Sequence, residues 1–411
     1  MDAAAQPLPD TCLPCHECGL VVDLGGLMEG RRAECPRCGC VLSHRRRQAN
    51  VRIVAFCLSA LICLGASLAF DFIDLVSTGI ERDLTLSETI STLFTLHEWT
   101  LAAFMCVVVI GLPLSFLLAL GALALSLELG KAGAYSVALL RFITFVRAWN
   151  MAEIFFLSVL ISMVKIAKMA QVSLGPSFWF YGLFILFLVL SLAQMDQYQL
   201  GLSIRRLLRQ PSPSTGPNPP PQAGEGWGGG LDTTTPPSQP SPASGGRSSL
   251  QRCWSLWLTG LIFYIPANLL PIMRTTQVGG SIDSTIAGGV ALLWDNQSYM
   301  IASIIFIASL LVPPAKFVAI AALALCQRHR GLLSPAAATS VYRFTEFVGR
   351  WSMVDVFVVG FLAALIQMGN LMNVVPGPAA LAFGGMVWFT MLAAHSLDPR
   401  VFWTSSEAAH E

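Results

Sequence analysis

The sequence contains few charged residues, and their two signs are balanced. Only 12% of its 411 residues are Asp, Glu, Lys or Arg and the net charge is +1, whereas an ordinary soluble domain carries roughly a quarter. A balanced charge creates neither the basic field that attracts nucleic acid nor an acidic surface that gathers cations. We therefore expect no nucleic-acid partner.

Two sequence patterns are also missing. No GxxxxGK(S/T) segment occurs, so ATP hydrolysis by a P-loop is not expected. The first 50 residues hold six arginines and no apolar run like that of a signal peptide, so no cleavage for secretion is expected.

Hydrophobic residues make up 54% of the chain, and the mean hydropathy is +0.63. This composition predicts a membrane protein and excludes a soluble enzyme.

Eight apolar stretches are long enough to cross a membrane, because a helix needs about 20 such residues to span a hydrocarbon core of ~30 Å. They fall into two groups of four. The expected spans are 51–71, 100–128, 150–172, 177–196, 254–273, 298–326, 351–373 and 379–396. The sequence thus predicts an all-α polytopic membrane protein with eight transmembrane helices.

The distribution of Lys and Arg predicts the orientation, because cytoplasmic loops of membrane proteins carry the excess of these residues. If the N-terminus is cytoplasmic, the segments on that side contain 19 of the 25 Lys and Arg residues, and the outward loops contain 4. Both termini are therefore expected in the cytoplasm.

The chain contains an internal repeat with an offset of 202 residues. Residues 140–157 and 342–359 are identical at 7 of 18 positions, including Trp149 and Trp351. Four spans per unit give both units the same orientation, so the sequence predicts two parallel four-helix repeats, which is one known plan of transporters. A duplicated membrane scaffold without transport is the alternative.

The segment 210–250 separates the two groups of spans. It is rich in Pro and Gly and has almost no aliphatic side chains, so it cannot bury a core and is expected to be a disordered linker. The expected domains are an N-terminal ribbon at 1–48, a first membrane repeat at 49–209, this linker, and a second membrane repeat at 251–411.

Six of the eleven cysteines lie in the first forty residues. Cys15 with Cys18, and Cys35 with Cys38, form two CxxCG motifs, and four thiolates at such spacing hold Zn²⁺ in structural zinc ribbons. The glycine after each pair lets the backbone fold back. We therefore predict one small cytoplasmic zinc ribbon, whose four protein ligands leave no open position for catalysis.

The spacing leaves other states of this cluster open. Cys12, Cys40 and His16 lie close enough in sequence to replace one of the four ligands. A rubredoxin-like iron site is a second alternative, and disulfides are a third. Disulfides are disfavoured on the reducing cytoplasmic side of a membrane.

Lys316 is the strongest candidate for a functional charge inside the membrane, where a charge costs ~2.5–3.5 kcal/mol on insertion. It follows Pro313 and Pro314, which remove backbone hydrogen bonds and predict a kinked or broken helix. In one interpretation Lys316 lines a transport cavity. In the other it snorkels, or pairs statically with Asp355.

Asn268 is a second polar candidate, because it lies in the fifth expected span between Pro266 and Pro271. Such a pattern is typical of discontinuous helices that line midplane sites in transporters. Alternatively, Asn268 hydrogen-bonds a backbone group that Pro271 leaves free.

Two carboxylates lie at the starts of expected spans. Glu153 and Asp355 are related by the repeat and each lies four residues after a tryptophan. They are candidates for proton coupling in a transport cavity. The alternative is that they anchor the helices at the interface, or form ion pairs with Arg147 and Arg350.

Several segments resemble the paraquat-inducible protein A family. They are the CxxC…CPRCG ribbon, IPANLLPIM at 265–273, RWSMVDVFVVGFLAALIQMGNL at 350–371 and LDPR at 397–400. The resemblance implies a bacterial inner-membrane protein with two tandem four-span units. It also implies a periplasmic partner with mammalian-cell-entry (MCE) domains, whose hexameric rings form tunnels for lipids between the inner and outer membranes.

The resemblance therefore implies a non-enzymatic role in intermembrane transport of phospholipid. In this family a second ribbon typically precedes the fifth span, but here only the linker and Cys253 do so, and a single zinc ion is expected. Two alternatives come from other functional classes. One is a secondary transporter of small solutes, and the other is a redox or stress protein whose cysteines sense oxidants.

Overall fold

The computed structural model describes residues 12–25, 28–44, 46, 48–77, 80–95, 99–131, 133–166, 171–209, 246–277, 280–295, 297–328, 333–365 and 372–403. Most of these residues are helical. Residues 210–245, which make up most of the expected linker, lie outside the described residues. The end of that expected linker instead belongs to helix α9 (Gly246–Leu269).

The first half of the membrane region runs from α1 to α8. Its elements are α1 (Ala49–Ala69), β5 (Asp71–Ser77), β6 (Ile80–Thr85), α2 (Leu86–Thr95), α3 (Trp99–Met105), η1 (Cys106–Gly111), α4 (Leu112–Glu128), α5 (Ala134–Trp149), α6 (Ala152–Ile166), β7 (Gln171–Leu174), α7 (Pro176–Gln194) and α8 (Gln197–Arg209).

The second half has the same order of elements from α9 onward. Its further elements are β8 (Met273–Gln277), β9 (Gly280–Ser284), α10 (Ile286–Asp295), α11 (Tyr299–Ile305), η2 (Phe306–Leu311), α12 (Val312–Arg328), α13 (Pro335–Trp351), α14 (Val354–Leu365), β10 (Met372–Pro376) and α15 (Pro378–His395). This recurrence supports the predicted duplication, which itself stays a prediction.

Among the residues that the structure describes, seven helical stretches are long and apolar enough to cross a membrane, so the chain is a multi-pass membrane protein. They are Ala49–Ala69, Trp99–Glu128, Tyr135–Val164, Pro176–Gln194, Ala302–Arg328, Pro335–Leu365 and Pro378–His395. Helix α9 covers most of the expected span 254–273 and packs along α15. It is not among the seven, because residues such as Arg252 and Asn268 lower its hydropathy. An eighth span stays a prediction.

The third span of each half differs from the prediction, because it begins earlier and is interrupted. Helices α5 and α6 are separated at Asn150 and Met151, where the backbone of Asn150 is extended, and α13 and α14 are separated at Ser352 and Met353. The segments 129–149 and 327–350, which we expected as cytoplasmic loops, therefore contain the helices α5 and α13.

The second span of each half contains a widened turn instead of a break. The π-helical segments η1 and η2 lie directly before Leu112 and Val312, and the helix then continues through Pro113 or through Pro313 and Pro314. Proline cannot donate a backbone hydrogen bond, and a π-turn is a common way to accommodate such a gap in the helical ladder.

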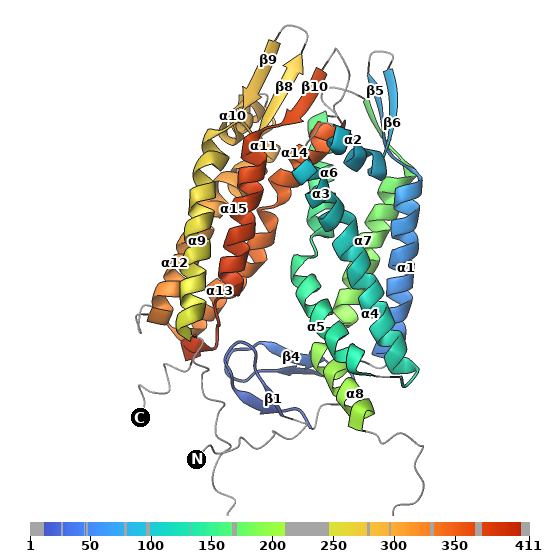
Figure 1. Cartoon of the computed structure of the whole chain (residues 1–411), viewed down its shortest axis with the longest axis vertical. Helices are drawn as coiled ribbons and strands as arrows, with labels where there is room; N and C mark the ends of the chain where they lie inside the picture. The colour runs from blue at the N-terminus through green and yellow to red at the C-terminus, as the bar shows by residue number, and fades with distance from the viewer. Residues whose placement is uncertain are drawn as a thin grey trace, which may run out of the picture.

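Two three-stranded antiparallel sheets project from the end of the molecule opposite the ribbon (Figure 1). Their strand orders are β6-β5-β7 and β10-β8-β9. The expectation of an all-α structure is wrong for this end of the molecule, which contains β-strands. Each sheet joins the segment after the first span to the short segment before the last span, and a pairing over so many residues leaves no local sequence pattern.

A glycine connects each sheet to the last helix of its half. A Cβ atom at Gly175 would lie 2.0 Å from the carbonyl oxygen of Asp71, and one at Gly377 would lie 2.1 Å from that of Pro271. Only glycine allows two backbones to approach so closely. The proline that follows each glycine begins helix α7 or α15, where its missing N–H is not needed.

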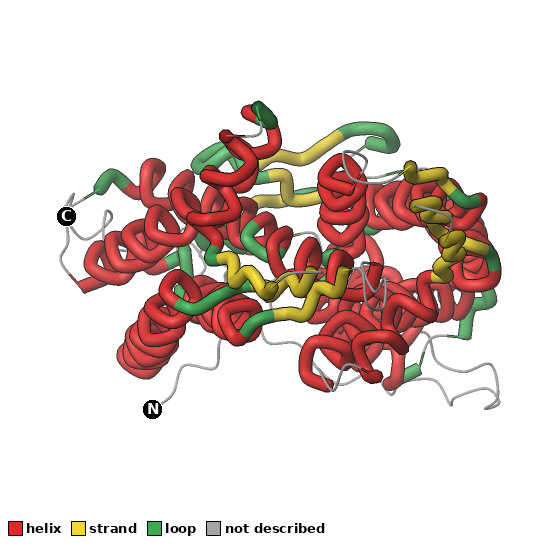
Figure 2. The backbone as a smooth tube through the Cα atoms, turned by 90° about the horizontal axis from the view of Figure 1, so that it is seen from above, coloured by secondary structure: helices red, strands yellow, loops and turns green. Residues whose placement is uncertain are grey.

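The two halves form two groups of helices that lie side by side (Figures 1 and 2). They meet where α6 packs on α14, and the Ser158 hydroxyl donates a hydrogen bond to the carbonyl of Val354 at 3.1 Å. The rings of Phe155 and Phe357 also make an edge contact there, with centroids 5.8 Å apart. Nearer the ribbon, Trp149 of α5 lies against Trp388 of α15, with centroids 4.4 Å apart.

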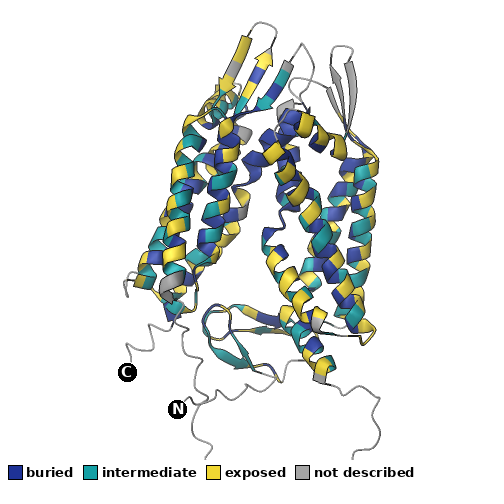
Figure 3. Cartoon of the chain, in the orientation of Figure 1, coloured by how far each residue is buried: buried dark blue, intermediate teal, exposed yellow. Residues whose placement is uncertain are grey.

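Burial follows the arrangement that a membrane requires (Figure 3). Every residue of α14 is buried between the halves, whereas large apolar side chains such as Leu58 of α1, Ile262 of α9 and Val318 of α12 are mostly exposed. Exposed apolar side chains in such numbers fit hydrocarbon and not water.

Candidate metal centre and inter-half cavities

Two knuckles, each a CxxCG motif between two short strands, make up the N-terminal ribbon. Strands β1 (Cys12–Pro14) and β2 (Val21–Asp23) flank the first CxxCG motif, and β3 (Arg32–Glu34) and β4 (Val41–His44) flank the second. Gly19 and Gly39 have positive φ angles of 76° and 68°. Each donates its N–H to the carbonyl of the first cysteine of its motif, at 2.9 Å. The glycines therefore close the turns as predicted.

The four predicted ligands come together between the knuckles. The sulfurs of Cys15, Cys18, Cys35 and Cys38 all lie within 4.8 Å of one another. Two close pairs, Cys15 with Cys38 and Cys18 with Cys35, are both 3.5 Å apart and join one knuckle to the other. A tetrahedral ion with Zn–S bonds of ~2.3 Å places its sulfurs about 3.8 Å apart. The cluster can therefore hold a metal ion.

The thiols are not in disulfides, since all eleven cysteines of the chain are described and all are free. Burial raises the pKa of Cys18 to about 11. Burial also acts on Cys35, but hydrogen bonds from the backbone amides of Cys38 and Arg37 outweigh it and lower the pKa to about 7. Because metals bind thiolates and not thiols, metal binding to this cluster is expected to release protons.

Two of the alternative ligands form a separate group beside the four cysteines. The Cys40 sulfur lies 3.4 Å from Nε2 of His16, and both are near Glu17. Cys12 belongs to neither group of possible ligands among the described residues. The main cluster therefore consists of the four predicted cysteines alone.

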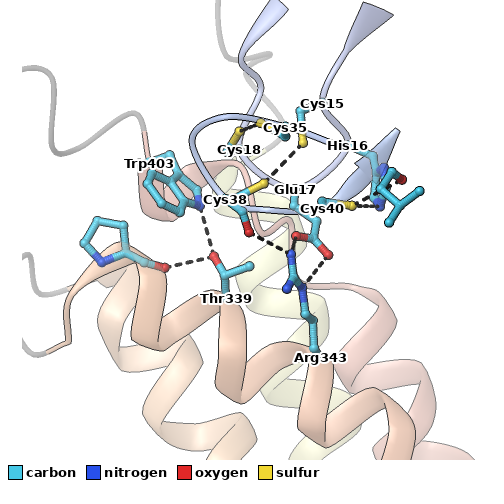
Figure 4. Close-up of polar contacts among 12 residues, drawn as sticks. Cys15, His16, Glu17, Cys18, Cys35, Cys38, Cys40, Thr339, Arg343 and Trp403 are labelled. Carbon is cyan, nitrogen blue, oxygen red and sulfur yellow. Dashed lines mark hydrogen bonds and ion pairs between the residues drawn. The ribbon is translucent and has the colours of Figure 1, made fainter. Parts of the chain in front are cut away.

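The ribbon packs on the second half through an arginine to which we assigned no role from the sequence (Figure 4). Arg343 of α13 donates from Nε to Glu17 at 2.8 Å and forms a second bond with the same carboxylate. It also donates to the carbonyl of Cys38 at 3.2 Å. The guanidinium carbon of Arg37 in the ribbon lies 4.9 Å from the ring centroid of Trp403. The indole N–H of Trp403 donates a hydrogen bond to the hydroxyl of Thr339 in α13.

The ribbon also contacts the first half. Asp196, at the start of α8, accepts hydrogen bonds from the hydroxyl of Ser43 and the backbone N–H of His44, both at 2.7 Å. Its other oxygen accepts the N–H of Tyr198 and caps the helix. The amide of Gln199 donates to Ser43 at 3.1 Å. No sequence pattern predicted this contact of Asp196.

Lys316 is buried, with 5% of its surface exposed. Its ammonium group has no hydrogen-bond partner among the residues that the structure describes. It borders a cavity of ≈ 10 Å³, whose walls include Ala148 of the first half and Glu346, Gly349 and His395 of the second. A Cβ atom at Gly349 would lie 3.0 Å from the ammonium nitrogen. The predicted cavity-lining lysine thus lies between the halves.

A larger cavity of ≈ 410 Å³ lies between α6 and α13. It is lined by Glu153, Ile154, Phe156, Leu157, Leu160, Phe347 and Trp351. One carboxylate and otherwise apolar or aromatic side chains surround the space. Asp355, the counterpart of Glu153, is 7% exposed and belongs to the buried helix α14. The repeat therefore places its two acids in different surroundings.

The amide of Asn268 bonds its own helix, with Nδ2 donating to the carbonyl of Tyr264 at 2.9 Å. Pro266 lies inside α9, which continues past it to Leu269, and Pro271 follows the helix end. This geometry resembles the capping alternative, although the carbonyl is not one that Pro271 leaves free. Neither cavity described above has Asn268 in its wall.

Comparison with known proteins places the chain among membrane transport proteins. The family model described as paraquat-inducible protein A matches residues 51–200 and 250–407. The chain is 35% identical over 97% of both chains to the Escherichia coli K12 protein named intermembrane transport protein PqiA. A Haemophilus influenzae protein named probable intermembrane transport protein is 27% identical over 96% of both chains.

A second Escherichia coli protein, named lipophilic envelope-spanning tunnel protein A, is 24% identical over 96% of this chain and 92% of its own length. No solved structure matches.

Proposed function

The chain belongs to the paraquat-inducible protein A family, and from this premise we propose that it is the inner-membrane component of a system that transports phospholipid between two membranes. Its relatives are named as intermembrane transport proteins and not as enzymes, which supports a membrane transport role. The observation that carries the lipid proposal is the ≈ 410 Å³ cavity between the halves, whose walls are apolar except for Glu153.

The proposed topology has eight spans in two parallel repeats, at 49–209 and 251–411, joined by the linker 210–250. The ribbon at 1–48 and both termini face the cytoplasm of a bacterium. Helix α9 supports the eighth span by its length of 24 residues and its packing on α15. The two strand-bearing ends then face the periplasm, where a hexameric MCE-domain tunnel protein would dock.

In the proposed mechanism, acyl chains occupy the larger cavity and Lys316 meets the lipid phosphate as a point charge. The burial of an ammonium group that has no hydrogen-bond partner among the described residues supports this role, because such a charge is costly in a membrane. Glu153 and Asp355 are the proposed proton-coupling groups. Pro266, Asn268 and Pro271 are proposed to line the transport path nearer the strand-bearing end, outside the two cavities described above.

Zinc is the proposed metal of the ribbon, because a cluster of four cysteine sulfurs matches its ligand preference. When bound, the ion supplies structural cross-links between the two knuckles. It takes no part in a reaction, since four protein ligands leave no open position.

Filling the larger cavity tests the proposed function. Leu157→Trp would place an indole in the cavity, and we expect lipid transfer between reconstituted vesicles to fall by about tenfold or more, which equals ~1.4 kcal/mol. The matched control is Leu58→Trp on the membrane-facing surface of α1, which should transfer lipid like the native chain.

Native mass spectrometry of the native chain and of the two variants gives a second measurement. We expect phospholipid bound to the native chain and to Leu58→Trp, and less bound to Leu157→Trp. Unchanged transfer in Leu157→Trp would contradict the assignment of this cavity. A bound small solute in place of lipid would favour a solute transporter.

A further inference from the structure

The ribbon hydrogen-bonds both halves at the end where α5 and α13 begin. Below the contact of α6 with α14, the two groups of helices diverge, and the ribbon lies beneath the space between them (Figure 1). On one side β4 is held by Asp196, and on the other Glu17 is held by Arg343. The ribbon therefore bridges the halves.

The bridge to the second half depends on both knuckles at once. Arg343 binds the carboxylate of Glu17, which belongs to the first knuckle, and the carbonyl of Cys38, which belongs to the second. Both groups must lie within reach of one guanidinium group for these bonds to form together. Arg343 thus contacts a surface that exists only while the knuckles are assembled.

The metal site is what assembles the knuckles. Each knuckle forms its own two-stranded sheet, β1 with β2 and β3 with β4, and no strand of one pairs with a strand of the other. Strands of three or four residues are too short to be stable alone. The thiols that meet across the gap, Cys15 with Cys38 and Cys18 with Cys35, supply the link.

The bridge to the first half lies on the second knuckle. Ser43 and His44, which bind Asp196, belong to β4. This strand follows Cys40 and is the last element before α1. The first knuckle, by contrast, meets the second half through Glu17 and the carbonyl of His16, which accepts from Arg400 at 3.3 Å. The second knuckle also reaches the second half, through the bond of Cys38 with Arg343 and the contact of Arg37 with Trp403. A load that separates the halves would therefore act on these two contacts and on the link between the knuckles at the metal site.

From these contacts we infer that the metal-loaded ribbon is a latch that fixes the spacing of the two halves at the ribbon end of the molecule. With the metal in place, Arg343 and Asp196 are tied to one rigid body. Without it, Glu17 and His16 are no longer fixed to the second knuckle, which keeps only the contacts of Cys38 with Arg343 and of Arg37 with Trp403 to the second half. The spacing is then held less tightly, and the contact of α6 with α14 becomes a hinge. This latch acts whatever molecule passes between the halves.

The test measures the distance between the halves directly. Spin labels are attached through non-canonical amino acids, without thiol chemistry, at Leu129 and Leu333, which are exposed and lie beside α4 and α13. Pulsed electron paramagnetic resonance in lipid nanodiscs gives the distance distribution, and metal analysis gives the ions bound per chain. Both are recorded for the full chain before and after treatment with a chelator.

Glu17→Gln and Arg343→Gln weaken the bridge without removing a metal ligand. We expect both variants to keep the metal and to show longer and broader distances, like those of the chelated native chain. The matched control is Glu29→Gln, an exposed ribbon carboxylate, which should give the native distribution. Arg343→Gln leaves the ribbon sequence untouched, so it reports on the bridge even where Glu17→Gln disturbs the ribbon.

Native distances in the chelated protein and in Arg343→Gln would overturn the latch. So would longer distances in Glu29→Gln alone. Because no lipid is measured, the latch can fail while the lipid-transfer proposal holds, and the reverse also applies.

Discussion

At the scale of single residues, Lys316 is the side chain whose surroundings are hardest to explain by stability alone. A buried ammonium group without a hydrogen-bond partner among the described residues is destabilising, because burial removes its hydration and nothing replaces it. Gly349 keeps the space at its tip open. A residue kept at such a cost is expected to serve transport.

Replacement of Lys316 by Met separates these two effects. Met keeps the length of the apolar stem and removes the charge, so we expect the thermal midpoint in detergent to rise or stay the same. Lipid transfer should fall by about tenfold, or ~1.4 kcal/mol. The control is Lys131→Met at an exposed position, which should change neither quantity. A lower midpoint with normal transfer would show that Lys316 is structural.

Local spacing made the four cysteine ligands predictable, since Cys15 and Cys18 are three residues apart and belong to one turn. The pair of Glu17 with Arg343 was not predictable, because 326 residues separate its partners and many acids and bases could have paired. From the sequence alone Arg343 had no assigned role. Its partner became visible when the ribbon was placed on α13.

At the scale of the elements, the junctions between sheet and helix are the tightest points of each half. The carbonyls of Asp71 and Pro271 occupy the space where a side chain at Gly175 or Gly377 would begin. Each glycine also donates its N–H to the strand, to Phe72 at 3.2 Å and to Ile272 at 2.8 Å. The junction therefore fixes where the last helix begins.

Gly175→Ala and Gly377→Ala should each destabilise the protein, because the added methyl group forces two backbones apart. Overpacking of this kind costs typically ~1–3 kcal/mol, and thermal unfolding in detergent measures it. Gly65→Ala is the matched control, since a Cβ there has nothing within 4 Å. If all three variants unfolded at the same temperature, the close approach of the two backbones would contribute nothing to stability.

Hydropathy located most of the spans, because uninterrupted apolar runs of about twenty residues are typical of membrane helices and rare in soluble domains. It misplaced the third span of each half, since Arg141 and Arg147 made 129–149 look like a loop while α5 is in fact helical. The sheets escaped prediction for a different reason. Strand β5 pairs with β7 about a hundred residues later, and short exposed strands carry no strong alternation.

At the scale of the whole molecule, the ribbon and the two sheets lie at opposite ends (Figure 1). The excess of Lys and Arg predicts that the ribbon end is cytoplasmic, and the seven candidate spans connect the two ends. The orientation decides which end can meet a periplasmic partner.

Site-specific labelling tests this orientation. Clickable amino acids at Thr276 of β8 and at Met28 of the ribbon, both exposed, are treated with a reagent that cannot cross membranes. In intact spheroplasts we expect labelling at Thr276 only, and at Met28 only after permeabilisation. The reverse pattern would place the ribbon in the periplasm and would remove the basis for docking a partner on the sheets.

The contact of Glu17 with Arg343 also has a consequence for folding during synthesis, because its two partners are made at different times. The ribbon leaves the ribosome first, and Arg343 is made 326 residues later, which at ~5–20 residues per second corresponds to about 16–65 s. During that interval the ribbon can take up its metal but has no second half to hold. The ribbon can therefore fold before α13 is inserted, and Arg343 of α13 then binds a surface that has already formed.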